Sequence, residues 1–382
     1  MSPTSTALTS RSISHGREAA GGFATWLVVD GQWTIPADIP TGLEVPDQTA
    51  ALLEFIATVP DGPGPVRDAT GAFLRDAEGN IIRAKNEIVI PAVYRVDQMF
   101  RLIGRTDLSL RFTSLGQKTG KFVRVTPDDD RGAPHLVLNH CNFMYLHRPW
   151  IVGTKPAGFG YDATREAQHA LQFESSTYID VYLPRTKKIW GDHLYFGKHS
   201  GETMWSDHIT VDGGVFGESG RDPMAMTAAS NIVVRNSSFG ACRTCIDLEP
   251  NGSTGGVTGV LVDSCQFGAH RLNFLAALSG STVGVVEQVT VNGCSVTGGN
   301  IAVTVAGGER RANFTFTANT GDVALGNPRG AVMWFDGVQG AITVTGNRNP
   351  VQMGRTPPMR IARFPNCPGP ITYEGNWPAD TG

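Results

Sequence analysis

The segment ITVDGGVF at residues 209–216 recurs in pattern five times further along the chain. The matching segments are IVVRNSSF (232–239), VLVDSCQF (260–267), VTVNGCSV (289–296), FTFTANTG (314–321) and ITVTGNRN (342–349), and successive segments begin 23, 28, 29, 25 and 28 residues apart. In each segment apolar and polar residues alternate before a small or Asn-containing corner, which predicts a β-strand with one buried face. A repeat of this length is typical of solenoids. We therefore predict an all-β fold, a right-handed parallel β-helix.

A second set of strand-like segments accompanies the first and predicts another wall of the same coils. Its members are DHLYF from Asp192, DPMAM from Asp222, CIDLE from Cys245, LNFLA from Leu272, NIAVTV from Asn300 and AVMWF from Ala331. Because parallel strands lie about 4.8 Å apart, equivalent positions of successive coils should form columns. Cys265 and Cys294 are expected to be neighbours in one such column.

The first hundred residues have a different pattern. PDQTAALLEFIATVPDG (46–62) predicts a short amphipathic helix with Asp47 as its N-cap, ended by Pro60, that covers the open end of the coil stack. DATGAFLRDAEGNIIRA (68–84) predicts a hairpin with its turn at residues 78–80. We divide the chain into an N-terminal arm or attachment segment (1–44), the capping helix, hairpin and first coils (45–106), the β-helix (107–350) and a C-terminal cap or tail (351–382).

Composition and charge exclude several classes of protein. With 41% hydrophobic and 18% charged residues the chain is expected to fold, and its net charge of −3 gives no basic surface for nucleic acid. No apolar run is long enough to insert into a membrane, and no apolar signal-peptide core is present near the N-terminus. The six cysteines are too few for a disulfide scaffold, so they are predicted to be buried thiols in a protein that folds in a reducing compartment.

From about Val45 to Asn349 the sequence resembles the pectin-lyase-like superfamily of right-handed β-helix proteins. The resemblance is carried by the predicted helix followed by EIVIPAVYRV (87–96) and RLIGRTDLSLRF (101–112). SGRDPMAMTAASNIVVRNSSFG (219–240) resembles coils of uncharacterised β-helix proteins from actinobacteria and their phages, including tailspike-like minor tail proteins. The superfamily contains hydrolases, lyases, epimerases, esterases and pure binders, so the resemblance implies a fold and not one reaction. The adjacent aspartates, Gly-His-Gly and Arg-x-Lys of polygalacturonases are not found, and Gly191-Asp192-His193 is the nearest counterpart.

Four carboxylates are the candidate catalytic residues. Alignment of the second strand set places Asp192 and Asp222 at equivalent positions on adjacent coils, with Asp247 and Glu249 facing outward on the coil after. Positions one and two coils apart are separated by about 5 and about 10 Å, which brackets the carboxylate separations of retaining and inverting glycosidases. Like charges at this distance raise one pKa and leave an acid beside a base. If Asp192 and Asp222 act as a pair, Asp192→Asn should abolish glycan release without changing thermal unfolding; the alternative is that these carboxylates are solvated surface residues.

Six further residues near the same positions are predicted to bind the substrate. They are His193, Tyr195, His199, Trp205, Arg221 and Arg243. Trp190 is a further candidate for stacking on a sugar ring, and the loop of residues 153–168 is a candidate flap over the site.

No metal or cofactor is expected. Cys242 and Cys245 form a lone C-x-x-C without the second pair that a zinc site needs. The three aspartates at 128–130 could hold calcium, but consecutive acids are more often an exposed turn. His135, His140 and His147 lack metal-ligand spacing and are predicted to be surface or corner residues.

Three functions remain open. The first is a phage tail protein, tailspike-like or a minor tail component, that binds and perhaps depolymerises a host cell-surface polysaccharide. Such a protein would be located in the virion and would contact other tail proteins through its N-terminal segment. Resemblance to tailspikes also implies a homotrimer. The second is a stand-alone bacterial polysaccharide lyase or glycoside hydrolase, exported by a non-Sec route, and the third is a structural or adhesive β-helix without catalysis.

Overall fold

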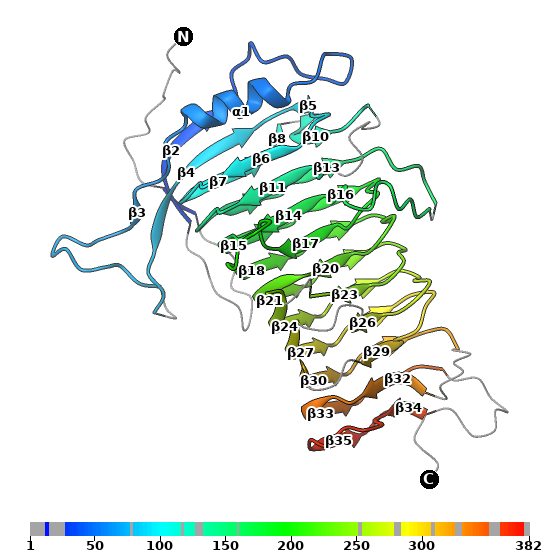
Figure 1. Ribbon diagram of the computed structural model, residues 1–382. Coiled ribbons are helices and arrows are strands. Elements are labelled where there is room, and N and C mark those ends of the chain that lie inside the picture. The colour runs from blue at the N-terminus through cyan, green and yellow to red at the C-terminus, as the bar shows by residue number, and fades with distance from the viewer. Residues whose placement is uncertain are drawn as a thin grey trace.

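The protein is a right-handed parallel β-helix whose coils stack in chain order, from an α-helix at the blue end to the last strand at the red end (Figure 1). The computed structural model describes residues 12–14, 27–76, 79–115, 118–126, 133–158, 160–250, 254–278, 284–306, 310–324, 331–350 and 360–377. Within these residues the predicted all-β fold class is confirmed. No helix among them is long and apolar enough to cross a bilayer.

Three sheets form the walls of the β-helix, and we number them by size. Sheet 1 has 14 strands: β1 (Ser12–Ser14), β2 (Leu27–Thr34), β3 (Gly64–Pro65), β4 (Arg83–Ile90), β7 (Leu108–Phe112), β12 (Tyr145–His147), β15 (Thr177–Tyr182), β18 (Ser206–Asp212), β21 (Ala228–Arg235), β24 (Gly256–Asp263), β27 (Val285–Asn292), β30 (Arg311–Thr317), β33 (Gln339–Thr345) and β35 (Ile371–Glu374).

Sheet 2 has 10 strands and carries the candidate site. They are β6 (Phe100–Ile103), β11 (Leu136–Asn139), β14 (Leu171–Glu174), β17 (Leu194–Gly197), β20 (Met224–Met226), β23 (Ile246–Leu248), β26 (Leu275–Ala277), β29 (Val303–Ala306), β32 (Ala331–Asp336) and β34 (Arg360–Arg363).

Sheet 3 has nine short strands, and a separate two-stranded hairpin lies outside the three walls. The sheet 3 strands are β5 (Val93–Arg95), β10 (Lys121–Val123), β13 (Trp150–Val152), β16 (Arg185–Lys187), β19 (Val215–Phe216), β22 (Ser238–Phe239), β25 (Gln266–Phe267), β28 (Ser295–Val296) and β31 (Thr320–Gly321). The hairpin consists of β8 (Ser114–Leu115) and β9 (Lys118–Thr119).

The six repeated segments stack as predicted. Their first residues lie on consecutive parallel strands of sheet 1, in register from Ile209 through Ile232, Val260, Val289 and Phe314 to Ile342. The second set of segments supplies consecutive strands of sheet 2. The alternating pattern therefore sets both the strands and their register.

Columns of identical or similar side chains fill the interior. Phe216, Phe239 and Phe267 stack with ring centroids 4.5 and 5.0 Å apart, close to the spacing between strands. Cys265 and Cys294 occupy one column, and each thiol donates to a backbone carbonyl, that of Asp263 for Cys265 (3.4 Å) and that of Asn292 for Cys294 (3.4 Å). All six cysteines are free thiols, and five of them are buried.

A ladder of buried amides lines the corner between sheets 1 and 3 in the last coils. Asn347 donates through Nδ2 to the carbonyl of Phe316 (2.8 Å), and its Oδ1 accepts from the backbone N–H of Asn319 (3.0 Å). Asn376 donates to the carbonyl of Val344 (2.8 Å) in the same way. Each amide satisfies backbone groups that the corner would otherwise leave unpaired.

The predicted capping helix is α1 (Thr49–Thr58), and it lies across the first coils (Figure 1). Leu52, Phe55 and Ile56 are buried in the main core. The N-cap residue is Gln48, one position later than predicted, and its side chain makes no capping hydrogen bond. Asp47 Oδ1 accepts from the Thr49 amide (3.1 Å) and hydroxyl (2.6 Å), so Asp47 still contacts the first turn.

The hairpin predicted at residues 68–84 is accompanied by a second turn. Arg75 and Ile81 form an antiparallel bridge on either side of the predicted turn, where residues 77 and 78 lie outside the described part of the chain, and Arg67 and Phe73 form another across residues 68–71. Parallel coils lie on both sides of residues 107–350. β4, among the predicted first coils, pairs with β7, and β34 and β35 pair with β32 and β33 in the segment predicted as a C-terminal cap or tail.

Candidate functional site

The four candidate carboxylates lie on three successive coils of sheet 2. Asp192 and Asp222 precede Leu194 and Met224, which are partners in the ladder, so the two aspartates are on adjacent coils as predicted. Asp247 lies within β23, and Glu249 follows that strand.

One guanidinium contacts all four carboxylates. Arg221 Nη1 is 3.4 Å from Asp192 Oδ2, Nε is 3.4 Å from Asp222 Oδ2, and Nη2 is 3.6 Å from Asp247 Oδ2 and 3.0 Å from Glu249 Oε2. The predicted substrate ligand Arg221 is therefore occupied by carboxylates, and only 15% of its side chain is exposed. Its pKa is raised because the four negative charges outweigh the effect of burial.

The carboxylates divide into a buried and an exposed pair. The side chains of Asp192 and Asp222 are 0% and 1% exposed, whereas those of Asp247 and Glu249 are 21% and 52% exposed. A substrate could reach only the second pair. The expectation that Asp192 and Asp222 line an open wall, and its alternative of solvated surface carboxylates for these two, are both wrong.

The buried pair serves the backbone of the corner. Asp192 Oδ1 accepts from the backbone N–H of Asp222 (3.1 Å), and Asp222 Oδ1 accepts from that of Thr244 (2.8 Å). Asp192 Oδ2 also lies 3.1 Å from Nδ1 of His169. Each aspartate thus links its coil to a neighbouring one, so Asp192→Asn is no longer expected to leave unfolding unchanged.

The electrostatics of the site favour protonated acids. Burial, followed by the charges of Asp192 and Asp247, holds the pKa of Asp222 well above its usual range. Burial, followed by the charge of Glu249, raises the pKa of Asp247 to about 6. Asp247 is therefore a partly exposed acid that titrates near neutral pH. Asp247 Oδ2 and Glu249 Oε2 lie 3.6 and 3.0 Å from the same Arg221 nitrogen, so the two oxygens are within about 7 Å of each other. This range overlaps the distances between the two catalytic carboxyl groups of glycosidases.

Two other predicted substrate ligands, Tyr195 and Arg243, lie on or beside this face. Tyr195 is half-buried and stacks on His169 with ring centroids 4.4 Å apart. Arg243 lies over the ring of Tyr161 (4.8 Å), which belongs to the predicted flap, and the Tyr161 side chain is exposed. The flap residue Gly158 donates its N–H to Glu218 Oε2 (2.9 Å), so the loop of residues 153–168 reaches coils further along the stack.

His193 is not a substrate ligand. Its side chain is fully buried, with Nδ1 2.6 Å from Thr186 Oγ1 and Nε2 2.7 Å from the carbonyl of Gly217. Burial lowers its pKa to about 4. The strand alternation that would turn this residue outward ends before the corner.

The remaining predicted stacking residues are engaged elsewhere. Trp205 donates Nε1–H to the carbonyl of Thr254 (2.9 Å) and covers Gly256, where a Cβ would come within 2.2 Å of the indole. Trp190 is covered by Arg165, whose guanidinium is 5.2 Å from the ring centroid.

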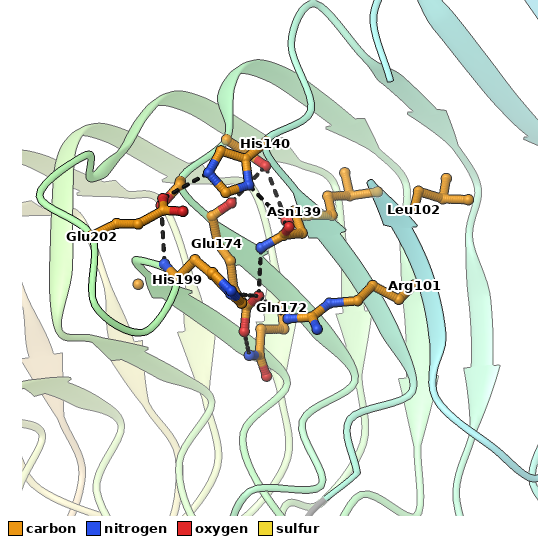
Figure 2. A network of polar contacts seen from close by, with 12 residues as sticks. Arg101, Leu102, Asn139, His140, Gln172, Glu174, His199 and Glu202 are labelled. Atoms are coloured by element: carbon orange, nitrogen blue, oxygen red, sulfur yellow. Dashed lines mark hydrogen bonds and ion pairs between the residues drawn. The ribbon is translucent and has the colours of Figure 1, made fainter. Parts of the chain in front are cut away.

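A second polar cluster on sheet 2, centred on Glu174, was missed by the sequence analysis (Figure 2). Glu174 Oε1 accepts from Gln172 (2.6 Å) and its Oε2 from Asn139 (2.8 Å), and Oε2 also pairs with Arg101. His199, the last predicted substrate ligand, belongs here, with Nδ1 3.4 Å from Glu174 Oε2.

The histidines dismissed as surface residues have three different environments. His140 joins the Glu174 cluster through Glu202 (2.6 Å). His135 is buried, with Nδ1 3.0 Å from the carbonyl of His169, so it is not a surface residue; it directly precedes β11, which is consistent with the corner alternative. His147 is half-buried and stacks on Tyr182 (5.7 Å).

Metal sites find no support among the residues that the structure describes, since no group of three His, Cys, Asp or Glu side chains is arranged to hold an ion. Cys242 and Cys245 are buried, with their sulfur atoms 3.6 Å apart. The candidate calcium ligands at 128–130 lie outside the described residues.

No model of a known protein family matches the chain, and no curated protein matches it. Solved structures do. The DFA-IIIase of Arthrobacter chlorophenolicus A6 without its lid matches with a TM-score of 0.53 and 10% identity, over 90% of this chain and 92% of that one. The family 28 exopolygalacturonase of Yersinia enterocolitica matches with a TM-score of 0.49 and 11% identity, over 90% of this chain and 78% of that one. The tailspike protein of E. coli bacteriophage HK620, in complex with a hexasaccharide, matches with a TM-score of 0.45 and 10% identity, over 86% of this chain and 72% of that one. At 10% identity, the similarity to the DFA-IIIase shows a shared fold and no more.

Proposed function

We propose that this protein binds and hydrolyses a polysaccharide on the outer face of sheet 2, with Asp247 and Glu249 as the catalytic residues. The observation that supports the proposal is that the more exposed Glu249 and the less exposed Asp247 both contact the same nitrogen, Nη2 of Arg221. Glycoside hydrolysis needs two carboxyl groups, one protonated and one ionised, on either side of the scissile bond.

The environments of the two groups suggest their roles. Asp247, whose pKa of about 6 keeps it partly protonated near neutral pH, would donate its proton to the leaving oxygen. Glu249, the more exposed of the two, would act as the nucleophile or as the base that activates water. Asp192 and Asp222 would be positioning residues, because they hold Arg221 and do not reach the surface.

The charge balance of the site favours a hydrolase over a lyase. Lyases that cleave uronate polymers by elimination need cationic groups to neutralise the substrate carboxylate. On this face the guanidinium of Arg221 is surrounded by carboxylates, and Arg101 pairs with Glu174. A neutral polysaccharide, recognised through hydroxyl groups, fits such a surface better than an acidic one.

The test is a screen of neutral and acidic polysaccharides for released reducing ends, followed by two variants. Asp247→Asn and Glu249→Gln should each lower the release rate at least about 100-fold, as loss of an acid–base group does. Glu287→Gln, an outward-facing carboxylate of sheet 1, is the control and should retain full activity. If both Asp247→Asn and Glu249→Gln keep their activity, these two residues are not the catalytic pair.

A product that absorbs as an unsaturated sugar would instead support the alternative of a polysaccharide lyase. Binding on a glycan array without any cleavage would support the third hypothesis, an adhesive β-helix.

For the biological setting we retain the proposal of a phage tail protein, tailspike-like or a minor tail component, acting on a host cell-surface polysaccharide. Six free thiols suit a protein that folds in the cytoplasm and leaves the cell by lysis. Attachment to other tail proteins through the N-terminal segment and a homotrimeric state belong to the same proposal. Mass spectrometry of virions and light scattering of the purified chain test them, and a monomeric enzyme absent from virions would favour the stand-alone alternative.

A further inference from the structure

The loop of residues 198–205 connects sheet 2 to sheet 1 and folds back over the Glu174 cluster. It carries His199 and Glu202, and both side chains pair with residues of earlier coils, His199 with Glu174 and Glu202 with His140 (Figure 2). Two histidine–carboxylate contacts therefore hold one loop onto the face of sheet 2.

The hydrogen bonds around His140 require a protonated imidazole. Its Nε2 lies 2.6 Å from Glu202 Oε2 and its Nδ1 lies 3.0 Å from Asn139 Oδ1. The Asn139 amide cannot be turned to offer its NH₂ group to His140, because that group donates to Glu174 Oε2 (2.8 Å). Both ring nitrogens thus face acceptors, and a neutral imidazole has only one N–H to donate.

We infer that His140, His199, Glu174 and Glu202 form a proton-dependent clasp that closes the loop of residues 198–205 when the histidines are charged and releases it when they are neutral. Histidine is the side chain that ordinarily changes charge between about pH 5 and 8. Loss of the proton from His140 places a lone pair against an oxygen at one of its two contacts, and the attraction to Glu202 is lost.

Two other charged groups, Arg101 and Lys198, lie around the clasp. Arg101 pairs with Glu174 from the adjacent side. Lys198 donates to the carbonyl of Glu202 (2.7 Å) and to Thr254. The rings of His140 and His199 are 5.9 Å apart, edge to face, so the two imidazoles repel each other when both are charged.

The clasp is connected to the proposed site. Lys198 and Trp205, at the two ends of the loop, both bond to Thr254, in the turn that follows Glu249. Release of the loop would therefore free one border of the exposed carboxylates. This regulatory consequence rests on the proposed function, whereas the clasp itself does not.

Hydrogen–deuterium exchange tests the clasp without a ligand. The amide of His199 donates to Ser175 Oγ (3.0 Å), which lies outside the loop, so its exchange reports on the closed loop. Its protection factor, corrected for intrinsic exchange at each pH, should fall roughly tenfold or more between about pH 5.5 and 8, as expected for loss of a charge-assisted hydrogen bond.

Two variants and a control complete the experiment. His140→Gln and Glu202→Gln should show low protection at both pH values. His208→Gln removes an exposed histidine that pairs with Asp207 at the same distance of 2.6 Å on sheet 1, and it should leave the pH dependence unchanged. Equal protection of the wild-type loop at both pH values, or a wild-type response in His140→Gln, would overturn the inference; loss of glycan cleavage alone would concern only the proposed function.

Discussion

Replacement of Arg221 by Met should destabilise the protein more than replacement of any exposed arginine, and the loss should depend on pH. Arg221 is the cation shared by four carboxylates, and Met keeps most of its apolar volume. Asp247 and Glu249 are partly solvated, so their contacts with Arg221 are screened and add little. Burial and the neighbouring carboxylates hold the pKa of Asp222 well above its usual range, which favours the uncharged form of that group.

Asp192 therefore dominates the magnitude. Its side chain is fully buried, and without Arg221 its charge would keep the hydrogen bond from the backbone N–H of Asp222 (3.1 Å) and the contact with His169, whose Nδ1 accepts from the Asp192 amide. Leaving a buried charge unpaired costs roughly 3–5 kcal/mol, and we expect the lower end because the hydrogen bond from Asp222 remains. The loss should shrink as the pH falls, since protonation of the buried carboxyl group removes the unpaired charge.

Urea unfolding followed by circular dichroism at several pH values measures this effect. Arg235→Met is the matched control: Arg235 is as little exposed as Arg221 (14% and 15%), but its partner Asp212, 3.1 Å away on sheet 1, is 17% exposed, whereas Asp192 is fully buried. Its loss should stay below about 1 kcal/mol. Equal losses in the two variants, or a loss in Arg221→Met that does not change with pH, would refute the view that Arg221 neutralises a buried charge.

Three further predictions concern other parts of the molecule. Asn347→Ala removes the hydrogen bonds of Asn347 to the carbonyl of Phe316 and the amide of Asn319. It should therefore lower the free energy of unfolding, measured by urea titration, by about 3 kcal/mol. A loss below about 1 kcal/mol would contradict the role of the amide ladder. The pKa of Asp247 is raised to about 6, so the protein is most stable with respect to this group below the ordinary carboxyl pKa and loses that stability as the pH rises through 6. The free energy of unfolding of Asp247→Asn, relative to the wild type, should therefore increase by up to about 3 kcal/mol between about pH 4 and 7. A difference that does not change with pH would argue against the raised pKa. The five buried thiols should not react with a disulfide reagent in the folded protein but should all react in denaturant, and fast reaction of any of them would place it at the surface.

The fold could be predicted because its signal is local and repeated. Alternation of apolar and polar residues specifies each strand, and the near-constant step between segments specifies which strands become neighbours. The ends were less predictable because β34 (Arg360–Arg363) and β35 (Ile371–Glu374) form a last coil outside the range over which the six segments were matched. Short strands with few alternating positions carry little information of their own.

The site was predicted only in part, because strand periodicity stops at a corner. Alignment correctly placed Asp192 and Asp222 on adjacent coils, but it could not show that both turn inward, or that His193 is buried against Thr186. The Glu174 cluster was missed for a related reason. Its members come from separate coils and a loop, and only the register of β11 (Leu136–Asn139) with β14 (Leu171–Glu174), which pairs Asn139 with Glu174, could have indicated it.

Two corners of the same coil stack solve one problem with different side chains. At the corner between sheets 1 and 3, neutral amides such as Asn319 and Asn347 accept from backbone N–H groups. At the start of the sheet 2 strands, Asp192 and Asp222 do so, and a buried carboxylate costs far more than a buried amide.

Stability alone therefore gives no reason for charge at the second corner, which then needs Arg221 to neutralise it. The charge of Asp192 does have one further effect: after burial and the charge of Glu249, it contributes to the raised pKa of Asp247, the partly exposed acid two coils further on. A corner built from amides would hold the coils equally well but would remove this contribution and make Asp247 a somewhat stronger acid. Under the proposed function, the buried aspartates therefore serve the acidity of the exposed pair as well as the fold.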